Sequence, residues 1–247
     1  MQEGLARDLE LLLNRRRLLG WMGAAACVPF VACTERVSAG ATCERIPEET
    51  GGPFPGDGTN GPNALDLDGI VRRDVRTSIG AMRGTAEGLP LTIRFRVLDS
   101  ARGCAPASGR AVYLWQCDRD GRYSLYSVRD QNYLRGVQVT DADGVVTFQS
   151  IFPAAYFGRW PHVHFEVYPS LAKASSASGV LATSQIAMPR DVCDQVFATS
   201  GYEQSRSNFS RMSLERDPVF RDGVALETPA VGGALSSGLS VSLDVGV

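Results

Sequence analysis

The chain has 247 residues, of which 44% are hydrophobic and 21% are charged, and its formal net charge is −2. This composition is typical of a globular protein with a sizeable core, and it excludes a disordered or membrane-embedded chain. The charge gives no electrostatic basis for a nucleic-acid partner, which needs a basic face.

Residues 1–39 have the features of an export signal. A basic cluster at residues 15–17 precedes a small and apolar run at residues 21–32, which is too short to span a bilayer. The paired arginines resemble a twin-arginine signal, and residues 30–33 resemble a lipoprotein processing site with Cys33 as the lipidated residue. We therefore predict an exported, periplasmic or extracytoplasmic protein, either soluble after cleavage or tethered to the membrane through Cys33. The alternative, a cytosolic amphipathic helix, is disfavoured because Gly, Pro and Cys interrupt the run.

Four cysteines remain after the leader, at positions 43, 104, 117 and 193. An even number fits disulfides in an oxidising compartment, and four cysteines allow three pairings. The short separation of Cys104 and Cys117 favours that pair and would leave Cys43 with Cys193, although the sequence does not decide among the three. None of the four has C-x-x-C spacing, which argues against a zinc site.

The rest of the chain is predicted to be mainly β. Residues 40–63 are rich in Gly and Pro and predict an ordered surface arm. Several short segments beyond it have strand patterns, and one has a helical pattern. The strands are expected at residues 91–99, 111–117, 136–140, 145–148, around the histidines, at 180–186 and at 239–245, and the short helix at 191–197. The Asp-Ala-Asp-Gly turn at residues 141–144 joins two of them into a hairpin.

Short strands with frequent turns predict an antiparallel β-sandwich with a Gly/Pro-rich N-terminal arm and long loops. We expect one domain over residues 40–247. Its parts are an arm at 40–90, a catalytic core at 91–190 and a C-terminal extension at 191–247.

Both histidines of the chain, His162 and His164, lie two positions apart. In an extended strand, residues i and i+2 point to the same face, so both imidazoles can reach one metal ion. The alternative is a pair of half-buried strand residues without a ligand.

Two tyrosines lie nearby in sequence. Tyr156 precedes His162 by six residues, and Tyr123 follows the turn at residues 118–121. A phenol has a pKa near 10, but a hard trivalent cation strongly favours its phenolate. Two imidazoles and two phenolates therefore suit ferric iron better than zinc, unless the tyrosines are simply core residues.

Residues 115–124, 133–144 and 152–164 together resemble the intradiol ring-cleavage dioxygenases, and in particular their exported branch. Residues 49–55 and 69–76 resemble that branch's N-terminal arm, so the resemblance extends from about residue 43 to at least residue 185. Two departures stand near the site: Phe157 replaces a usual Pro, and Ala154 with Ala155 replaces a Gly-aromatic pair.

The resemblance implies a role for each of six residues. Tyr123 matches the tyrosine that stays bound to iron during turnover, and Tyr156 matches the axial tyrosine that leaves when substrate binds. His162 and His164 match the two histidine ligands. Arg159 matches the arginine that stabilises negative charge on the ring, and Gln185 matches a glutamine behind the ligands. Their alternatives are a surface ion-pair residue for Arg159 and an exposed strand residue for Gln185.

The implied activity is that of a non-haem Fe(III) dioxygenase. It would cleave a catechol-type ring with O₂ to a cis,cis-muconate-type diacid, so its partners would be a small aromatic diol and O₂. The sequence leaves open which diol is the substrate and which oligomeric state the protein adopts. Two other classes are an exported aromatic-binding protein that keeps the iron site without ring cleavage, and a purely structural β-sandwich. A ferrous oxygenase is disfavoured because its usual ligand set needs a carboxylate, and Glu166 is not a familiar third ligand.

Overall fold

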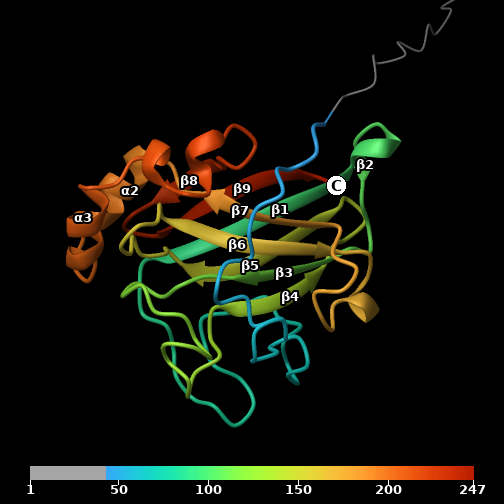
Figure 1. The fold of residues 1–247 in the computed structure, drawn as a ribbon, viewed down its shortest axis with the longest axis horizontal. Coiled ribbons are helices and arrows are strands. Elements are labelled where there is room, and N and C mark those ends of the chain that lie inside the picture. The colour runs from blue at the N-terminus through green and yellow to red at the C-terminus, as the bar shows by residue number, and fades with distance from the viewer. Residues whose placement is uncertain (1–42) are drawn as a thin grey trace, which may run out of the picture. The chain divides into compact units, whose positions relative to one another are not determined.

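The structure, a computed structural model, describes residues 43–247. The predicted leader at residues 1–39, with its lipidation site at Cys33, lies outside the described residues. Figure 1 shows two β-sheets with helices and long loops around them.

The nine strands of the described region form one five-stranded and one four-stranded sheet. In the first, β1 (Pro90–Asp99) pairs with β2 (Ala105–Pro106) and β5 (Val145–Ile151) on one side and with β9 (Gly238–Gly246) on the other, and β8 (Ala230–Ala234) follows β9. The second has the order β4-β3-β6-β7, formed by β4 (Arg135–Val139), β3 (Ala111–Trp115), β6 (His162–Tyr168) and β7 (Ala182–Ala187).

The inner faces of the two sheets share one hydrophobic core. Phe95 of β1 meets Phe165 of β6 with 4.7 Å between the ring centroids. Val112, Leu114 and Phe148 belong to the same cluster and are fully buried. Alternate residues of each strand point into this core, as the period-2 patterns require. The predicted β-sandwich is therefore confirmed.

One pairing differs from a wholly antiparallel arrangement. β9 pairs with β1 in parallel, from Leu91 opposite Leu239 to Leu98 opposite Gly246. The alternation at residues 239–245 predicts a strand but carries no information on its partner or direction, because a period of two is common to both kinds of sheet.

β6 is buried on both faces. Val163, Phe165 and Val167 point into the sandwich core, whereas His162 and His164 point to the outer face of the four-stranded sheet. The N-terminal arm, blue in Figure 1, covers part of that outer face: the Glu49 amide donates to the Thr183 carbonyl at 2.8 Å. The arm therefore converts an exposed sheet face into an enclosed site.

Two helices lie between β7 and β8 along the described part of the chain. α2 (Arg190–Phe197) agrees with the predicted helix, whereas α3 (Glu203–Phe209) and β8 have no clear sequence pattern. Both helices lie at one end of the sheets in Figure 1. Single 3₁₀ turns make up the remaining helical elements of residues 43–247: η1 (Ser100–Arg102), η2 (Leu171–Lys173), η3 (Leu214–Arg216) and η4 (Phe220–Asp222). No helix within residues 43–247 is long and apolar enough to cross a membrane.

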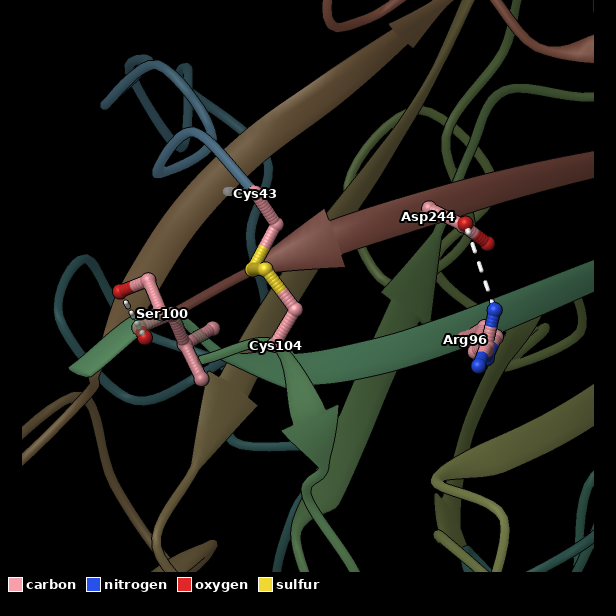
Figure 2. Close-up of a disulfide and its surroundings, with 6 residues drawn as sticks. Cys43, Arg96, Ser100, Cys104 and Asp244 are labelled. Atoms are coloured by element: carbon pink, nitrogen blue, oxygen red, sulfur yellow. Dashed lines mark hydrogen bonds and ion pairs between the residues drawn. A yellow bond between two sulfur atoms is a disulfide. The ribbon is translucent and has the colours of Figure 1, made fainter. Parts of the chain in front are cut away.

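The disulfide pairing differs from the favoured prediction. Cys43 is bonded to Cys104, with 5.6 Å between their Cα atoms, whereas Cys117 and Cys193 are buried free thiols. Figure 2 shows the bond joining the start of the arm to the segment just after β1. The short separation of Cys104 and Cys117 was misleading because Cys117 follows β3, a strand of the other sheet. The start of the arm instead lies beside the end of β9, where Arg45 bridges to Gly246, and this brings Cys43 to Cys104.

Candidate active site

The strand register places two predicted site residues, His164 and Gln185, opposite each other on neighbouring strands. His164 lies opposite Gln185 of β7 and opposite Trp115 of β3. The Trp115 ring stacks on the His164 ring with 4.8 Å between centroids and 5° between planes. His162 and His164 thus have fixed positions on a sheet face that has little freedom to move.

Loops bring the two tyrosines to this face. Tyr123 follows the turn after β3, in which both the Asp120 and Arg122 amides donate to Asp118 Oδ1. Tyr156 lies in the loop between β5 and β6. A Cβ placed on Gly121, where φ is +81°, would be 3.0 Å from Tyr156 Cβ, so glycine at this position lets the two loops approach closely.

The side-chain ends of the four predicted ligands converge on one point. His162 Nε2 lies 3.1 Å from His164 Nε2, 3.3 Å from Tyr123 Oη and 3.2 Å from Tyr156 Oη. The two phenol oxygens are 3.3 Å apart. The structure therefore brings together two residues adjacent on a strand and two from separate loops.

This donor set fits a metal ion. The His162 Nδ1 proton is donated to the Trp160 carbonyl at 2.5 Å, which leaves the Nε2 lone pair facing the other three donors. Nitrogen and oxygen ligands at about 2.0–2.2 Å from a common metal are separated by roughly 3 Å, as these atoms are. Residues 43–247 contain no cluster of three or more His, Cys, Asp or Glu side chains suited to a metal. A site here therefore depends on the tyrosines.

Burial sets the protonation states of these side chains in the absence of a metal. Loss of hydration, and then the nearby Arg159 charge, lower the pKa of His162 to about 3, and burial lowers the pKa of His164 well below its usual value. Burial also raises the pKa of Tyr156 to about 12 and raises that of Tyr123. Neutral imidazoles are ready to act as ligands, whereas phenolates in this site need a cation to form.

Arg159 is directed at the cluster by three contacts. Its Nη2 donates to Gln185 Oε1 at 2.6 Å, its Nε donates to Asp217 Oδ2 at 3.0 Å, and its Nη1 lies 3.4 Å from His162 Nε2. The alternative of a surface ion-pair residue is therefore excluded for Arg159, because its side chain is only 13% exposed. A fixed guanidinium beside the ligands can stabilise negative charge that develops there.

Gln185 is fully buried rather than an exposed strand residue. Its amide donates to the Thr50 carbonyl at 2.8 Å while its oxygen accepts from Arg159. Gln185 thereby connects the arm to Arg159 across β7. Gly52, two residues along the arm, faces His164: a Cβ built on it would lie 3.4 Å from His164 Cε1.

Sequence reasoning did not identify Asp217 or Trp115 as site residues. Asp217 follows η3 in a segment without a strand or helix pattern, 58 residues from its partner Arg159. Trp115 is one of the continuous apolar residues of β3, and such a run does not separate a core residue from one that supports a ligand. Only the register of β3 on β6 reveals its stacking on His164.

The two departures from the family pattern occupy different environments. Ala154 and Ala155 are each 2% exposed, whereas the Phe157 ring is 92% exposed between Tyr156 and Gly158. The alanines therefore change packing behind the loop. Phe157 presents an apolar ring to solvent directly after Tyr156 and two positions before Arg159.

Comparisons with known proteins identify dioxygenases as similar to this chain. Residues 72–167 match a family model described as a dioxygenase, a range that contains Arg159 and all four predicted ligands but neither Gln185 nor Asp217. The chain is similar to an intradiol ring-cleavage dioxygenase from Tetranychus urticae, with 27% identity over 83% of this chain and 94% of that one and a TM-score of 0.64. It shares its fold with the dioxygenase domain of a dioxygenase carbohydrate-binding protein fusion from Streptomyces sp. SirexAA-E, at 21% identity, 83% and 98% coverage and a TM-score of 0.53. A search of curated proteins found no match.

Proposed function

This chain belongs to the intradiol ring-cleavage dioxygenases, a family of oxidoreductases, and from that premise we propose a specific activity for it. It is a non-haem Fe(III)-dependent enzyme that cleaves a catechol-type ring with O₂ to a cis,cis-muconate-type diacid. The observation that supports this most is the convergence of His162, His164, Tyr123 and Tyr156 at separations of 3.1 to 3.3 Å.

The chemistry of the donors supports ferric iron. Two phenolates offset most of a 3+ charge, whereas a divalent zinc ion gains less from them and is usually held by Cys, His or carboxylate. When bound, Fe(III) supplies Lewis acidity, which draws electron density from a catecholate and prepares its ring for O₂.

The protein's own groups would handle protons and charge. Tyr156 is half-buried, whereas Tyr123 is 1% exposed, so Tyr156 is the more accessible of the two phenols. As the phenolate, which a bound cation would favour, its Oη would take a proton from a substrate hydroxyl. The Arg159 guanidinium, with Nη1 toward the cluster, would stabilise negative charge on the attacked ring carbon.

Aromatic and backbone groups enclose the reaction site. Trp115 stacks on His164, and Phe54 of the arm lies against Tyr123 with 4.9 Å between ring centroids. These groups exclude water from one side of the ligands, and they strengthen electrostatic interactions there by lowering the local dielectric constant.

Iron loading and O₂ uptake test the proposal. We expect iron-loaded protein to be burgundy from tyrosinate-to-iron charge transfer and to consume O₂ with one of catechol, protocatechuate or hydroxyquinol. His162→Ala and Tyr123→Phe should lose iron and colour, whereas the matched control Tyr126→Phe, three residues away and outside the cluster, should retain both. A colourless protein that takes up no iron contradicts the metal site. An iron-loaded protein that binds catechols without consuming O₂ supports the aromatic-binding alternative.

We also propose that the protein is exported and acts outside the cytoplasm. The leader at residues 1–39 supports this, and so does the Cys43–Cys104 disulfide, which suits an oxidising compartment. Cell fractionation tests the proposal: replacing Arg15 and Arg16 with Lys should retain the protein in the cytoplasm, and unchanged export would contradict the twin-arginine assignment. If the protein is lipid-anchored through Cys33, replacing Cys33 with Ser should move it from the membrane fraction to the soluble fraction.

A further inference from the structure

Asp217 is a buried carboxylate in the C-terminal extension, outside the range matched by the dioxygenase family model. It lies between the 3₁₀ turns η3 and η4 and is 0% exposed. An ionised carboxylate in such a position is unfavourable unless several donors compensate it.

Four donors surround this carboxylate. Arg159 Nε lies 3.0 Å from Oδ2 and 3.3 Å from Oδ1, and the Trp160 amide donates to Oδ2 at 2.5 Å. The Val219 and Phe220 amides donate to Oδ1 at 2.8 and 3.2 Å. Burial alone would raise the pKa of Asp217, but the amide donors and Arg159 outweigh it and keep the pKa below its usual value.

The contacts determine the direction of the Arg159 guanidinium. This group is planar and rigid, so holding two of its nitrogens sets the position of the third. Asp217 holds Nε and Gln185 holds Nη2, which leaves Nη1 directed at the ligand cluster, 3.4 Å from His162 Nε2.

Asp217 also acts on the backbone next to His162. It accepts from the amide of Trp160, and the carbonyl of the same residue accepts from His162 Nδ1 at 2.5 Å. The same carboxylate therefore contacts both the Arg159 side chain and the Trp160 backbone.

We propose that Asp217 is a positioning residue that aligns the Arg159 guanidinium with the reacting ring, so that the C-terminal extension completes the active site. This proposal rests on the proposed ring-cleavage function. The hydrogen-bond partners of Asp217 in the described region are Arg159 and three backbone amides, so its effect on turnover passes through Arg159.

Asp217→Asn tests the role with little change in volume. A side-chain amide has one accepting oxygen where the carboxylate has two. The donors that bond to one of the two carboxylate oxygens therefore lose their acceptor. We expect kcat to fall roughly tenfold to a hundredfold, as for other residues that orient active-site groups, with little change in KM for catechol. Iron content and the colour of the resting protein should stay the same. The matched control is Asp222→Asn, an exposed acidic residue five positions further on, which should leave turnover unchanged.

A double-mutant cycle with Arg159→Met separates positioning from general structural damage. Positioning through Arg159 predicts that Asp217→Asn adds little to the loss of kcat already caused by Arg159→Met. Losses that multiply, unchanged kcat in Asp217→Asn, or loss of iron and colour along with activity would each overturn the proposal.

A urea-unfolding cycle on the same four proteins tests the Asp217–Arg159 pairing without turnover. If the two substitutions change the free energy of unfolding non-additively, the pairing is supported. If their changes in that free energy add, the pairing is contradicted. Wild-type protein that consumes no O₂ contradicts the proposed function instead, so the two failures are distinguishable.

Discussion

At the scale of single residues, Glu227 is an unusual group behind the site. It is fully buried, and neither carboxylate oxygen has a hydrogen-bond partner among the described residues. Burial, and then the negative charges of Glu49 and Asp222, raise the pKa of Glu227 to about 8. Ser184 lies close enough to oppose the shift, yet its hydroxyl forms no hydrogen bond of normal geometry.

This shift predicts that stability depends on pH. The folded state binds the Glu227 proton more tightly than the unfolded chain, in which the pKa of this carboxyl is near 4.5. Proton binding therefore stabilises the folded state fully below pH 4.5, and this stabilisation is lost as the pH rises to about 8. The loss is on the order of 2–4 kcal/mol. Urea unfolding tests this: between pH 5 and 8.5 the free energy of unfolding should decline less in Glu227→Gln than in wild type. The exposed control Glu215→Gln should follow wild type, and identical curves for wild type and Glu227→Gln would contradict the shift.

At the scale of elements, the arm joins both sheets and the site. Its start is bonded to Cys104, Arg45 then bridges to Gly246 of β9, and Thr50 further along accepts from Gln185. A segment with almost no regular structure is therefore held by contacts at intervals, each with a residue distant in sequence.

Removing the disulfide should destabilise the protein. Replacing Cys43 and Cys104 with Ser opens a bridge across a sequence separation of 61 residues, for which chain entropy predicts a loss of about 4 kcal/mol in the free energy of unfolding. Urea unfolding without reductant measures it. As a control, dithiothreitol should lower wild type to the stability of the variant and leave the variant unchanged. Equal stability of the two proteins without reductant would contradict a structural role.

The buried thiols provide a separate check. Burial raises the pKa of Cys117 to about 12 and raises that of Cys193, so both should resist alkylation in the folded protein. Peptide mapping after iodoacetamide should find Cys117 and Cys193 labelled once the protein is denatured. Cys43 and Cys104 should be labelled only when the denatured protein is also reduced. Labelling of Cys117 in the native protein would contradict its burial.

At the scale of the whole molecule, the last strand is part of the core. β9 lies between β1 and β8 and pairs with β1 along eight residue positions. Residues 191–247 are therefore more than an extension of a catalytic core at 91–190, because the five-stranded sheet is incomplete without them.

Substitutions in β9 should therefore destabilise the whole domain. Leu243 is 6% exposed and points into the shared core, so Leu243→Ala should lower the free energy of unfolding by about 2–5 kcal/mol. The neighbouring Ser242→Ala, on the opposite face, should change it little. Thermal unfolding followed by circular dichroism measures both. A small effect of Leu243→Ala would show that β9 contributes little to the core.

The sequence predicted much of the sandwich and the residues of the candidate ligand set. Strand patterns at residues 91–99 and 111–117 reflect alternation between faces, which is a local property of the chain. The two histidines could be assigned to one face for the same reason. Tyr123 and Tyr156 were suggested by their positions and by the affinity of phenolate for a hard cation. The resemblance gave each its role, because no local pattern distinguishes a ligand tyrosine from a core tyrosine.

The sequence by itself thus determined where the predicted strands lie, which of their residues share a face, and that the His162 and His164 imidazoles point to the same side of the sheet. Tertiary structure alone decided which cysteines bond, that β9 runs parallel to β1, and that Asp217 meets Arg159. The physical reason is that side-chain alternation is encoded within a few residues. Contacts across 58 or 61 residues depend instead on how strands and loops pack, and the local sequence carries no record of that arrangement.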